Sequence, residues 1–272
     1  MKKISGIIAN PVARNSAIMF VGTMATNFGA YLYHVVVGRI MGPEKYSEIA
    51  ALFSLLFLLS VPANVIQVVL TKYFSVYKAS HDVGAARTLF MKSLTYIVVA
   101  SIVGLLIYLP LIPLLQNLLH IKDFGVFLSL YAIVVSTFIM TSCTGLLIGF
   151  QKFLAFSGFS TIMIFLRLLS GFLLASFGVA LTLFGNVVSN IIGIILFLLP
   201  IQFVFKKAPD KITIHRKEVL AYVIPTFLAI LGLTIFYNID VVLVKHFFEP
   251  AQAGIYASLA IFGKIIFFAS SP

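Results

Sequence analysis

The sequence has 272 residues, of which 61% are hydrophobic and 10% charged, and its mean hydropathy is +1.11. Soluble domains average about 45–50% apolar and about 25% charged residues, so this composition excludes a soluble domain and indicates a membrane protein. The 19 Lys and Arg residues outnumber the 8 Asp and Glu residues and leave a formal net charge of +11.

Eight apolar stretches follow one another along the chain. Each is about as long as the roughly 20 residues that cross a hydrocarbon core of about 30 Å as a helix. They exceed the roughly 9–11 residues of a lipid-facing strand, which favours helices over a barrel. They cover residues 16–38, 46–70, 94–115, 124–148, 153–177, 179–205, 219–244 and 251–269. The expected fold is an all-α polytopic membrane protein with about eight transmembrane helices.

The Lys and Arg residues concentrate in alternate connections between these stretches. With the N-terminus inside, 13 of them fall in inner segments and 4 in outer segments, whereas Arg167 and Lys264 lie within apolar stretches. The positive-inside rule then predicts a multi-pass protein of the cytoplasmic (inner) membrane with both chain ends in the cytoplasm. This distribution accounts for the net charge and argues against a nucleic-acid partner.

Residues 31–39 and 237–245 form a candidate internal repeat. They read YLYHVVVGR and YNIDVVLVK, which agree at the first, fifth and sixth positions. Each lies at the outer end of an expected helix, before a turn that contains proline. Chance similarity and a true repeat both stay open. A true repeat places the copies six helices apart and in the same orientation, as in transporters built from parallel repeats.

The repeat divides the chain into three expected parts. Residues 1–205 form a first lobe of six transmembrane helices, residues 206–217 a basic cytoplasmic linker, and residues 218–272 the start of a second lobe, with helices seven and eight. The last apolar stretch lacks the basic flank that is normal on the cytoplasmic side. We therefore expect a truncated chain.

Two stretches resemble a known family. Residues 39–46 read RIMGPEKY, similar to a family turn between helices one and two with the pattern R, two hydrophobic residues, then G-P-x-x-Y. Asp240 and the G-x-Y at residues 254–256 are similar to the family's connection between helices seven and eight. The family is the polysaccharide-transporter branch of the multidrug/oligosaccharidyl-lipid/polysaccharide (MOP) exporter superfamily, which includes the O-antigen (Wzx-type) and lipid II flippases. Ser47 stands where the family usually has glycine.

The resemblance implies two six-helix lobes around a central cavity, of which this chain supplies the first lobe and the first two helices of the second. It also implies alternating access that carries a polyprenyl-diphosphate-linked oligosaccharide, such as an O-antigen unit, across the membrane. The partners it implies are the lipid-linked glycan, membrane lipid, and a glycan polymerase or ligase.

Two cations fall near the middle of the membrane by helix arithmetic. At 1.5 Å per residue, Arg167 lies about 18 Å from Ala155, where the fifth stretch is expected to enter the membrane from inside, and Lys264 lies about 20 Å from the outer start of the eighth. A charge at this depth costs about 2.5–3.5 kcal/mol, so each needs a partner. We interpret them as one anion site for the diphosphate head group. A buried ion pair or a backbone-capping contact is the alternative for each.

Other polar residues lie within the apolar stretches. His34 and Asp240 occupy similar depths in the repeated helices and are candidates for proton coupling, with a wetted rim of a vestibule as the alternative. Asn27, Asn64 and Gln67 are candidate polar residues of a cavity. For these three, as for Asn186 and Asn190, interhelical hydrogen bonds are the alternative.

The motifs of common catalytic sites are absent from the sequence. It has no G-x-S-x-G, no H-E-x-x-H and no phosphate-binding loop, and no two of its acids are adjacent to hold a metal ion. We therefore expect no catalytic residue, no metal and no cofactor, and a carrier rather than a polytopic membrane enzyme of glycan biosynthesis. A drug or cation antiporter of the same superfamily, similar to the MATE transporters, is the second alternative. Because the first six stretches hold a deep cation and no deep acid, an anionic cargo is favoured.

Overall fold

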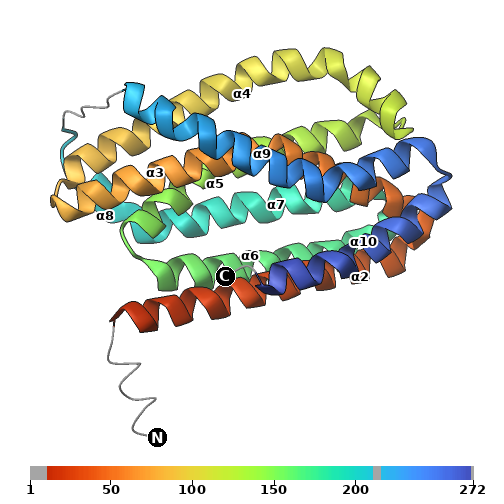
Figure 1. The fold of residues 1–272 in the computed structure, drawn as a ribbon, viewed down its shortest axis with the longest axis horizontal. Coiled ribbons are helices and arrows are strands. Elements are labelled where there is room, and N and C mark those ends of the chain that lie inside the picture. Colours follow the sequence, from red (N-terminus) through yellow and green to blue (C-terminus); the bar gives the residue numbers. More distant parts are fainter. Residues whose placement is uncertain (1–10, 211–215, 271–272) are drawn as a thin grey trace, which may run out of the picture.

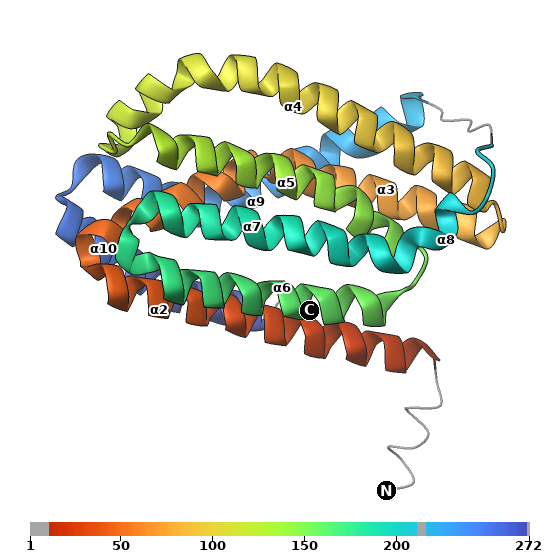
Figure 2. The same ribbon diagram turned by 180° about the vertical axis from the view of Figure 1, so that it is seen from behind.

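The computed structural model describes residues 11–210 and 216–270. All regular structure in this part of the chain is helical, which confirms the expected fold class. The helices are α2 (Pro11–Leu59), α3 (Val61–Ala79), α4 (Val83–Leu119), α5 (Phe124–Gly149), α6 (Phe153–Leu174), α7 (Val179–Leu198), α8 (Gln202–Phe205), α9 (Arg216–Phe247) and α10 (Pro250–Ser270). The long helices lie side by side along the long axis of the molecule (Figure 1, Figure 2).

Five helical stretches of the described residues are long and apolar enough to cross a membrane, and α2 with α3 makes a sixth candidate that is bent by 42°. The five are Val83–Leu119, Phe124–Gly149, Phe153–Phe177, Val179–Phe205 and Ala221–Phe247. Many large apolar side chains on these helices are exposed, as lipid contact requires. These features confirm a polytopic membrane protein.

A glycine breaks α2 into two helical segments. Gly42 has φ 74° and ψ 170°, a conformation that L side chains rarely adopt, and Pro43 follows it. The chain reverses direction there, so the second segment of α2 runs back beside the first (Figure 1). The predicted turn after the first apolar stretch therefore lies where the sequence indicated.

The second and third spans differ from their predicted limits. The expected helix 46–70 is interrupted at Ser60, and its continuation α3 extends to Ala79. Pro62 lies in the first turn of α3, where proline is tolerated but cannot continue a preceding helix without a bend. The expected helix 94–115 starts earlier because the side chain of Asp82 accepts a hydrogen bond of 2.7 Å from the backbone N of Ala85 and caps α4.

The connections gather at two ends of the bundle. We call the end that holds Gly42 the junction end; it also holds the turns 120–123, 175–178 and 248–249. We call the opposite end the linker end; it holds the turns 80–82 and 150–152 and the segment 206–210. Neither name assigns the end to a particular side of the membrane.

Polar contacts fix the linker end. Arg87 donates from Nη1 to the backbone oxygens of Phe205 and Lys207, which ties the segment after α8 to α4. Lys152, in the turn before α6, donates to the backbone oxygen of Pro200 and lies 3.9 Å from the centroid of the Phe203 ring. Burial lowers the pKa of Lys152 from its usual value.

Small residues let the helices approach closely. A Cβ added at Gly149 of α5 would lie 2.5 Å from the Cβ of Phe74 in α3. One added at Gly193 of α7 would lie 2.2 Å from the sulfur of Met163 in α6. These contacts agree with the packing role of small residues in membrane helices.

Candidate functional site

Arg167 belongs to a polar cluster in which α2, α5, α6 and α7 meet. Its Nη2 donates to Oδ1 of Asn190 at 2.9 Å, and Nδ2 of Asn190 donates to Oγ of Ser136 at 2.9 Å. One turn earlier on α7, Nδ2 of Asn186 donates to the hydroxyl of Tyr33 at 2.8 Å. We call these five residues the Arg167 cluster. Its two asparagines therefore form the interhelical hydrogen bonds that the sequence indicated as an alternative.

The spacing on α7 explains why both asparagines face the same neighbours. Residues four apart lie on one face of a helix, and both Asn186 and Asn190 are fully buried. Gly171 of α6 gives Tyr33 room, because a Cβ there would lie 2.7 Å from the tyrosine ring. Oδ1 of Asn186 is buried without a hydrogen-bond partner within the described residues. The cluster thus holds more hydrogen-bonding capacity than these contacts use.

The guanidinium of Arg167 has no negatively charged partner among the described residues, and most of its N–H donors make no hydrogen bond there. It has five N–H groups, and its one hydrogen bond within residues 11–210 and 216–270 is to an uncharged amide. No carboxylate among these described residues lies within 4.0 Å of it. Part of the residue is exposed, while protein surrounds its charged end. A planar guanidinium suits a phosphate because it donates two parallel hydrogen bonds.

Lys264, the second cation of the predicted anion site, lies in α10, but its side chain falls outside the part that the structure describes. A shared site of Arg167 and Lys264 therefore stays a prediction. Arg167 lies about 21 Å along α6, reckoned at 1.5 Å per residue from Phe153.

A second polar site joins α9 and α10 to the turn of α2 at the junction end. Lys245 of α9 donates from Nζ to Oγ of Ser47 at 2.9 Å, and both side chains are buried. Gly254 of α10 packs against Pro43, because an added Cβ would lie 1.9 Å from the backbone oxygen of that proline. We call these four residues the junction site. The two stretches that carry the family resemblance therefore contact each other.

The histidines at the junction end add further contacts. His34 of α2 lies with Nδ1 3.2 Å from the hydroxyl of Tyr46, beyond the turn. His246, next to Lys245, pairs through Nδ1 with the backbone oxygen of Leu118 at 2.8 Å. Its ring stacks on His120 with centroids 5.6 Å apart. The end of α9 is therefore held by both the α2 turn and the α4–α5 connection.

Asp240 lies two turns before the end of α9 and accepts a hydrogen bond of 2.9 Å at Oδ2 from the hydroxyl of Tyr256 in α10. Its Oδ1 is buried and has no hydrogen-bond partner in the part of the chain described. Its role in coupling, together with that of His34, stays a prediction.

The three candidate cavity residues lie in α2 and α3 and are not members of the Arg167 cluster. Asn27 is half-buried in the first segment of α2, whereas Asn64 is exposed and Gln67 half-buried in α3. Their place in a cavity stays a prediction. Among the described residues, no group of three or more His, Cys, Asp or Glu side chains is arranged to hold a metal ion.

Several residues of the two polar sites were missed by sequence reasoning. Tyr33 and Ser136 carry no motif, and only their neighbours in space identify them. Lys245 was counted among the outer connections, yet it lies in α9 with 4% of its surface exposed. One signal was present, because Ser47 replaces the glycine usual in the family, and its hydroxyl is what Lys245 binds.

Comparisons with known proteins give a family and a fold. The family model described as polysaccharide biosynthesis protein matches residues 12–267. A MOP superfamily transporter from Pyrococcus furiosus is similar in structure, with a TM-score of 0.67, 15% identity, and coverage of 95% of this chain and 67% of that one. A search of curated protein sequences finds no match to this chain.

Multidrug resistance MATE family transporters of the MOP superfamily are similar as well. The outward-facing conformation of one has a TM-score of 0.68 and 15% identity, with 94% of this chain and 64% of that one covered. An inward-facing conformation has a TM-score of 0.65 and 15% identity, with 89% and 59% covered. The chain thus spans about two thirds of the length of these transporters, and at this identity the likeness shows the fold.

Proposed function

Because the chain belongs to the polysaccharide biosynthesis protein family and has the fold of MOP superfamily transporters, we propose that it carries a polyprenyl-diphosphate-linked oligosaccharide across the cytoplasmic membrane. The cargo is an O-antigen unit or another precursor of a surface polysaccharide. It crosses by alternating access, in which residues 1–205 and residues 218–272 belong to different lobes.

The observation that supports an anionic cargo is the state of Arg167. A charge in the middle of the membrane costs about 2.5–3.5 kcal/mol, and here an amide, not a carboxylate, is its partner among the described residues. A bound diphosphate would stabilise this buried cation through charge-assisted hydrogen bonds. The free energy that Arg167 costs in the empty site thus becomes affinity for an anion. Lys264 approaches the same depth from the other lobe and completes the anion site.

A drug or cation antiporter is the alternative function. It needs negative charge in the cavity to attract its cargo, and the described spans of residues 1–205 hold a deep cation instead. Asp240 favours the alternative, because one of its carboxylate oxygens is buried without a partner in the described structure. We assign Asp240 and His34 to coupling instead, and Asn27, Asn64 and Gln67 to the polar lining of the cavity.

The linker end faces the cytoplasm in this proposal. Lys78, Arg87, Lys152, Lys206 and Lys207 lie there, as the positive-inside rule predicts for a cytoplasmic face. The contacts of the junction site then close the outer face, and the cargo enters from the cytoplasmic side. A glycan polymerase or ligase acts on the cargo after it has crossed, and either one is the expected protein partner.

The proposal is tested in a bacterial strain that lacks its own flippase for a surface polysaccharide. Expression from the native reading frame that contains this sequence should restore the surface glycan, detected by gel staining or with a lectin. The control is the same frame with Arg167→Gln, with membrane insertion verified. Extrusion of a cationic dye without any restored glycan would instead establish the antiporter.

A further inference from the structure

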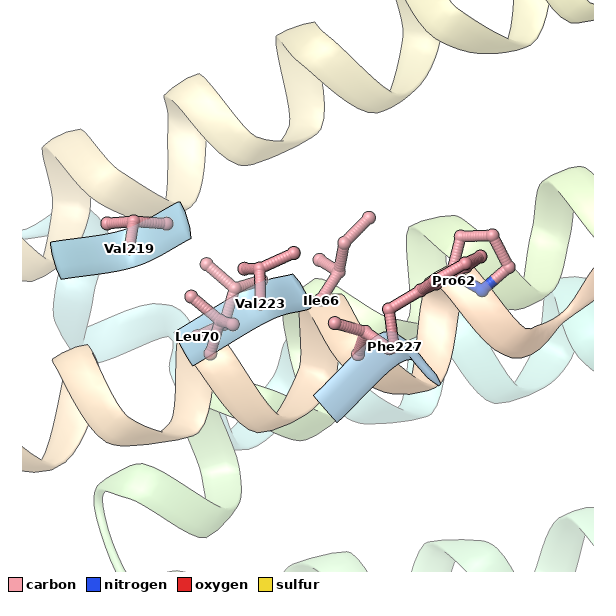
Figure 3. Close-up of a pocket in the computed structure, with 8 residues that line it drawn as sticks. Pro62, Ile66, Leu70, Val219, Val223 and Phe227 are labelled. Atoms are coloured by element: carbon pink, nitrogen blue, oxygen red, sulfur yellow. The ribbon is translucent and has the colours of Figure 1, made fainter. Parts of the chain in front are cut away.

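An apolar groove lies between α3 and α9, away from the Arg167 cluster. Its volume is about 270 Å³, and all eight side chains that line it are apolar. The lining residues come from α3 and α9, and Figure 3 shows their side chains close together. The labelled ones are Pro62, Ile66, Leu70, Val219, Val223 and Phe227.

Helix geometry explains why the groove is continuous and why it stays open. Val219, Val223 and Phe227 are spaced four apart, so they form one stripe on α9 about 12 Å long at 1.5 Å per residue. Both helices carry a proline near the groove, with Pro62 in the first turn of α3 and Pro225 inside α9. Proline removes a backbone hydrogen bond and disturbs the regular surface of a helix, which favours a gap where two helices meet.

The groove has a cation at the end nearest the linker. Lys72 lies two residues after Leu70 on α3, and its Nζ is 4.7 Å from the centroid of the Tyr222 ring. Tyr222 precedes Val223, so the ammonium is held against the helix that forms the other wall. Cation–π contacts of this kind hold a lysine near an aromatic face while leaving its N–H donors free for another ligand.

An apolar channel with a cation at one end fits an amphiphile with a hydrocarbon tail and an anionic head. A polar group within the channel would find no hydrogen-bond partner among the apolar side chains, which excludes a glycan. A groove of about 270 Å³ is too small for the two acyl chains of a phospholipid together, whereas it can hold a short stretch of a single chain. A polyprenyl diphosphate has a single chain and an anionic head.

We propose that the α3–α9 groove is a loading site that binds the part of a polyprenyl tail nearest its diphosphate, with the diphosphate held by Lys72. This inference rests on the proposed function, because the polyprenyl-linked cargo comes from it. It adds a binding step at the linker end that comes before the head group reaches Arg167. The tail stays between α3 and α9 while the head group moves inward.

Photocrosslinking tests the groove directly. Phe227 is replaced by p-benzoylphenylalanine, which keeps an aromatic ring at that place, and Ile66 is replaced likewise as a second position. The matched control is Phe165 of α6, which is 62% exposed and lies at a similar distance along its helix from the linker end. Purified protein in phosphatidylethanolamine and phosphatidylglycerol nanodiscs receives a 55-carbon polyprenyl diphosphate, and intact-mass spectrometry measures the adducts.

We expect a polyprenyl adduct at positions 227 and 66 and little at position 165. Lys72→Gln should lower the yield with the diphosphate about three- to fivefold, as for one exposed charge contact, and leave the yield with neutral polyprenol unchanged. Equal yields at 227 and 165, or phospholipid adducts alone at 227, would overturn the loading site. The crosslinking yield reports binding and not transport, so the loading site and the proposed function can fail separately. Glycan export without adducts refutes the loading site. Adducts without glycan export refute the proposed function.

Discussion

Replacing Asn190 by aspartate separates a ligand-binding role of Arg167 from a structural one. The substitution keeps the oxygen that accepts the 2.9 Å hydrogen bond from Arg167 and places a negative charge beside the guanidinium. Two unit charges about 4 Å apart attract each other by about 4 kcal/mol at an effective dielectric constant of about 20. The hydroxyl of Ser136 can donate to the new carboxylate if it gives up its hydrogen bond of 2.9 Å to the backbone oxygen of Ile133. The fold should therefore be kept or stabilised, while a diphosphate finds the cation already neutralised.

Asn190→Leu should have the opposite effect on stability. It removes the acceptor of a hydrogen bond from a charged group, worth about 1.5–3 kcal/mol, and leaves the guanidinium without its amide. At about 2–4 °C per kcal/mol, the melting temperature should fall by several degrees.

Thermal melting in detergent, followed by size-exclusion chromatography, and glycan export in a flippase-deficient strain are measured for both variants. The control is Asn117→Asp, at an exposed position near the junction end of α4, which should melt within about 2 °C of the unmodified protein. Export at the unmodified rate by Asn190→Asp would refute the reasoning, because transport would then not require an unneutralised Arg167.

The remaining predictions concern the junction site and the topology. Gly254→Ala should destabilise the protein strongly because its Cβ would lie 1.9 Å from a backbone oxygen, whereas Gly263→Ala on the same helix meets open space and should melt at or above the original temperature. Ser47→Ala should lower the melting temperature more than Lys245→Met. The first substitution leaves the buried ammonium of Lys245 without its hydrogen-bond acceptor, whereas the second removes the ammonium itself. A larger fall for Lys245→Met would contradict this account of the contact. A cysteine in place of Asp210, in a background without Cys143, should react with an impermeant maleimide only after the cytoplasmic side is opened, and labelling of intact cells would reverse the topology.

The membrane fold was predictable because its signals are local. Apolar runs of about 20 residues predict helices wherever they occur, since the membrane leaves the backbone few other structures. The turn at Gly42 could be predicted because its signal is local as well. Glycine followed by proline ends a helix through the backbone conformation of these two residues alone. The break at Ser60 was not predicted. Pro62 lies in the first turn of α3, where a proline marks a helix start as well as a bend.

The partners in the site were less predictable because they come from helices far apart in sequence. Asn190 lies 23 residues from Arg167, and Asn186 lies 153 residues from Tyr33, so no local pattern links them. Lys245 looked like a connection residue because it ends an apolar stretch, yet packing against Ser47 buries it. The depth of Arg167 followed from helix arithmetic, whereas its amide partner required the packing of α6 against α7.

Translocation by purified protein in liposomes tests the central claim most directly. The native reading frame with the original Arg167, with Arg167→Lys and with Arg167→Gln is reconstituted with a fluorescent polyprenyl-diphosphate oligosaccharide, and the fraction that reaches the opposite leaflet is measured over time. We predict rapid transfer with arginine, partial transfer with lysine, which keeps the charge but loses the bidentate geometry, and none above protein-free liposomes with glutamine. Equal transfer by all three proteins would contradict an anion site at Arg167, and no transfer by the original protein would contradict the proposed function.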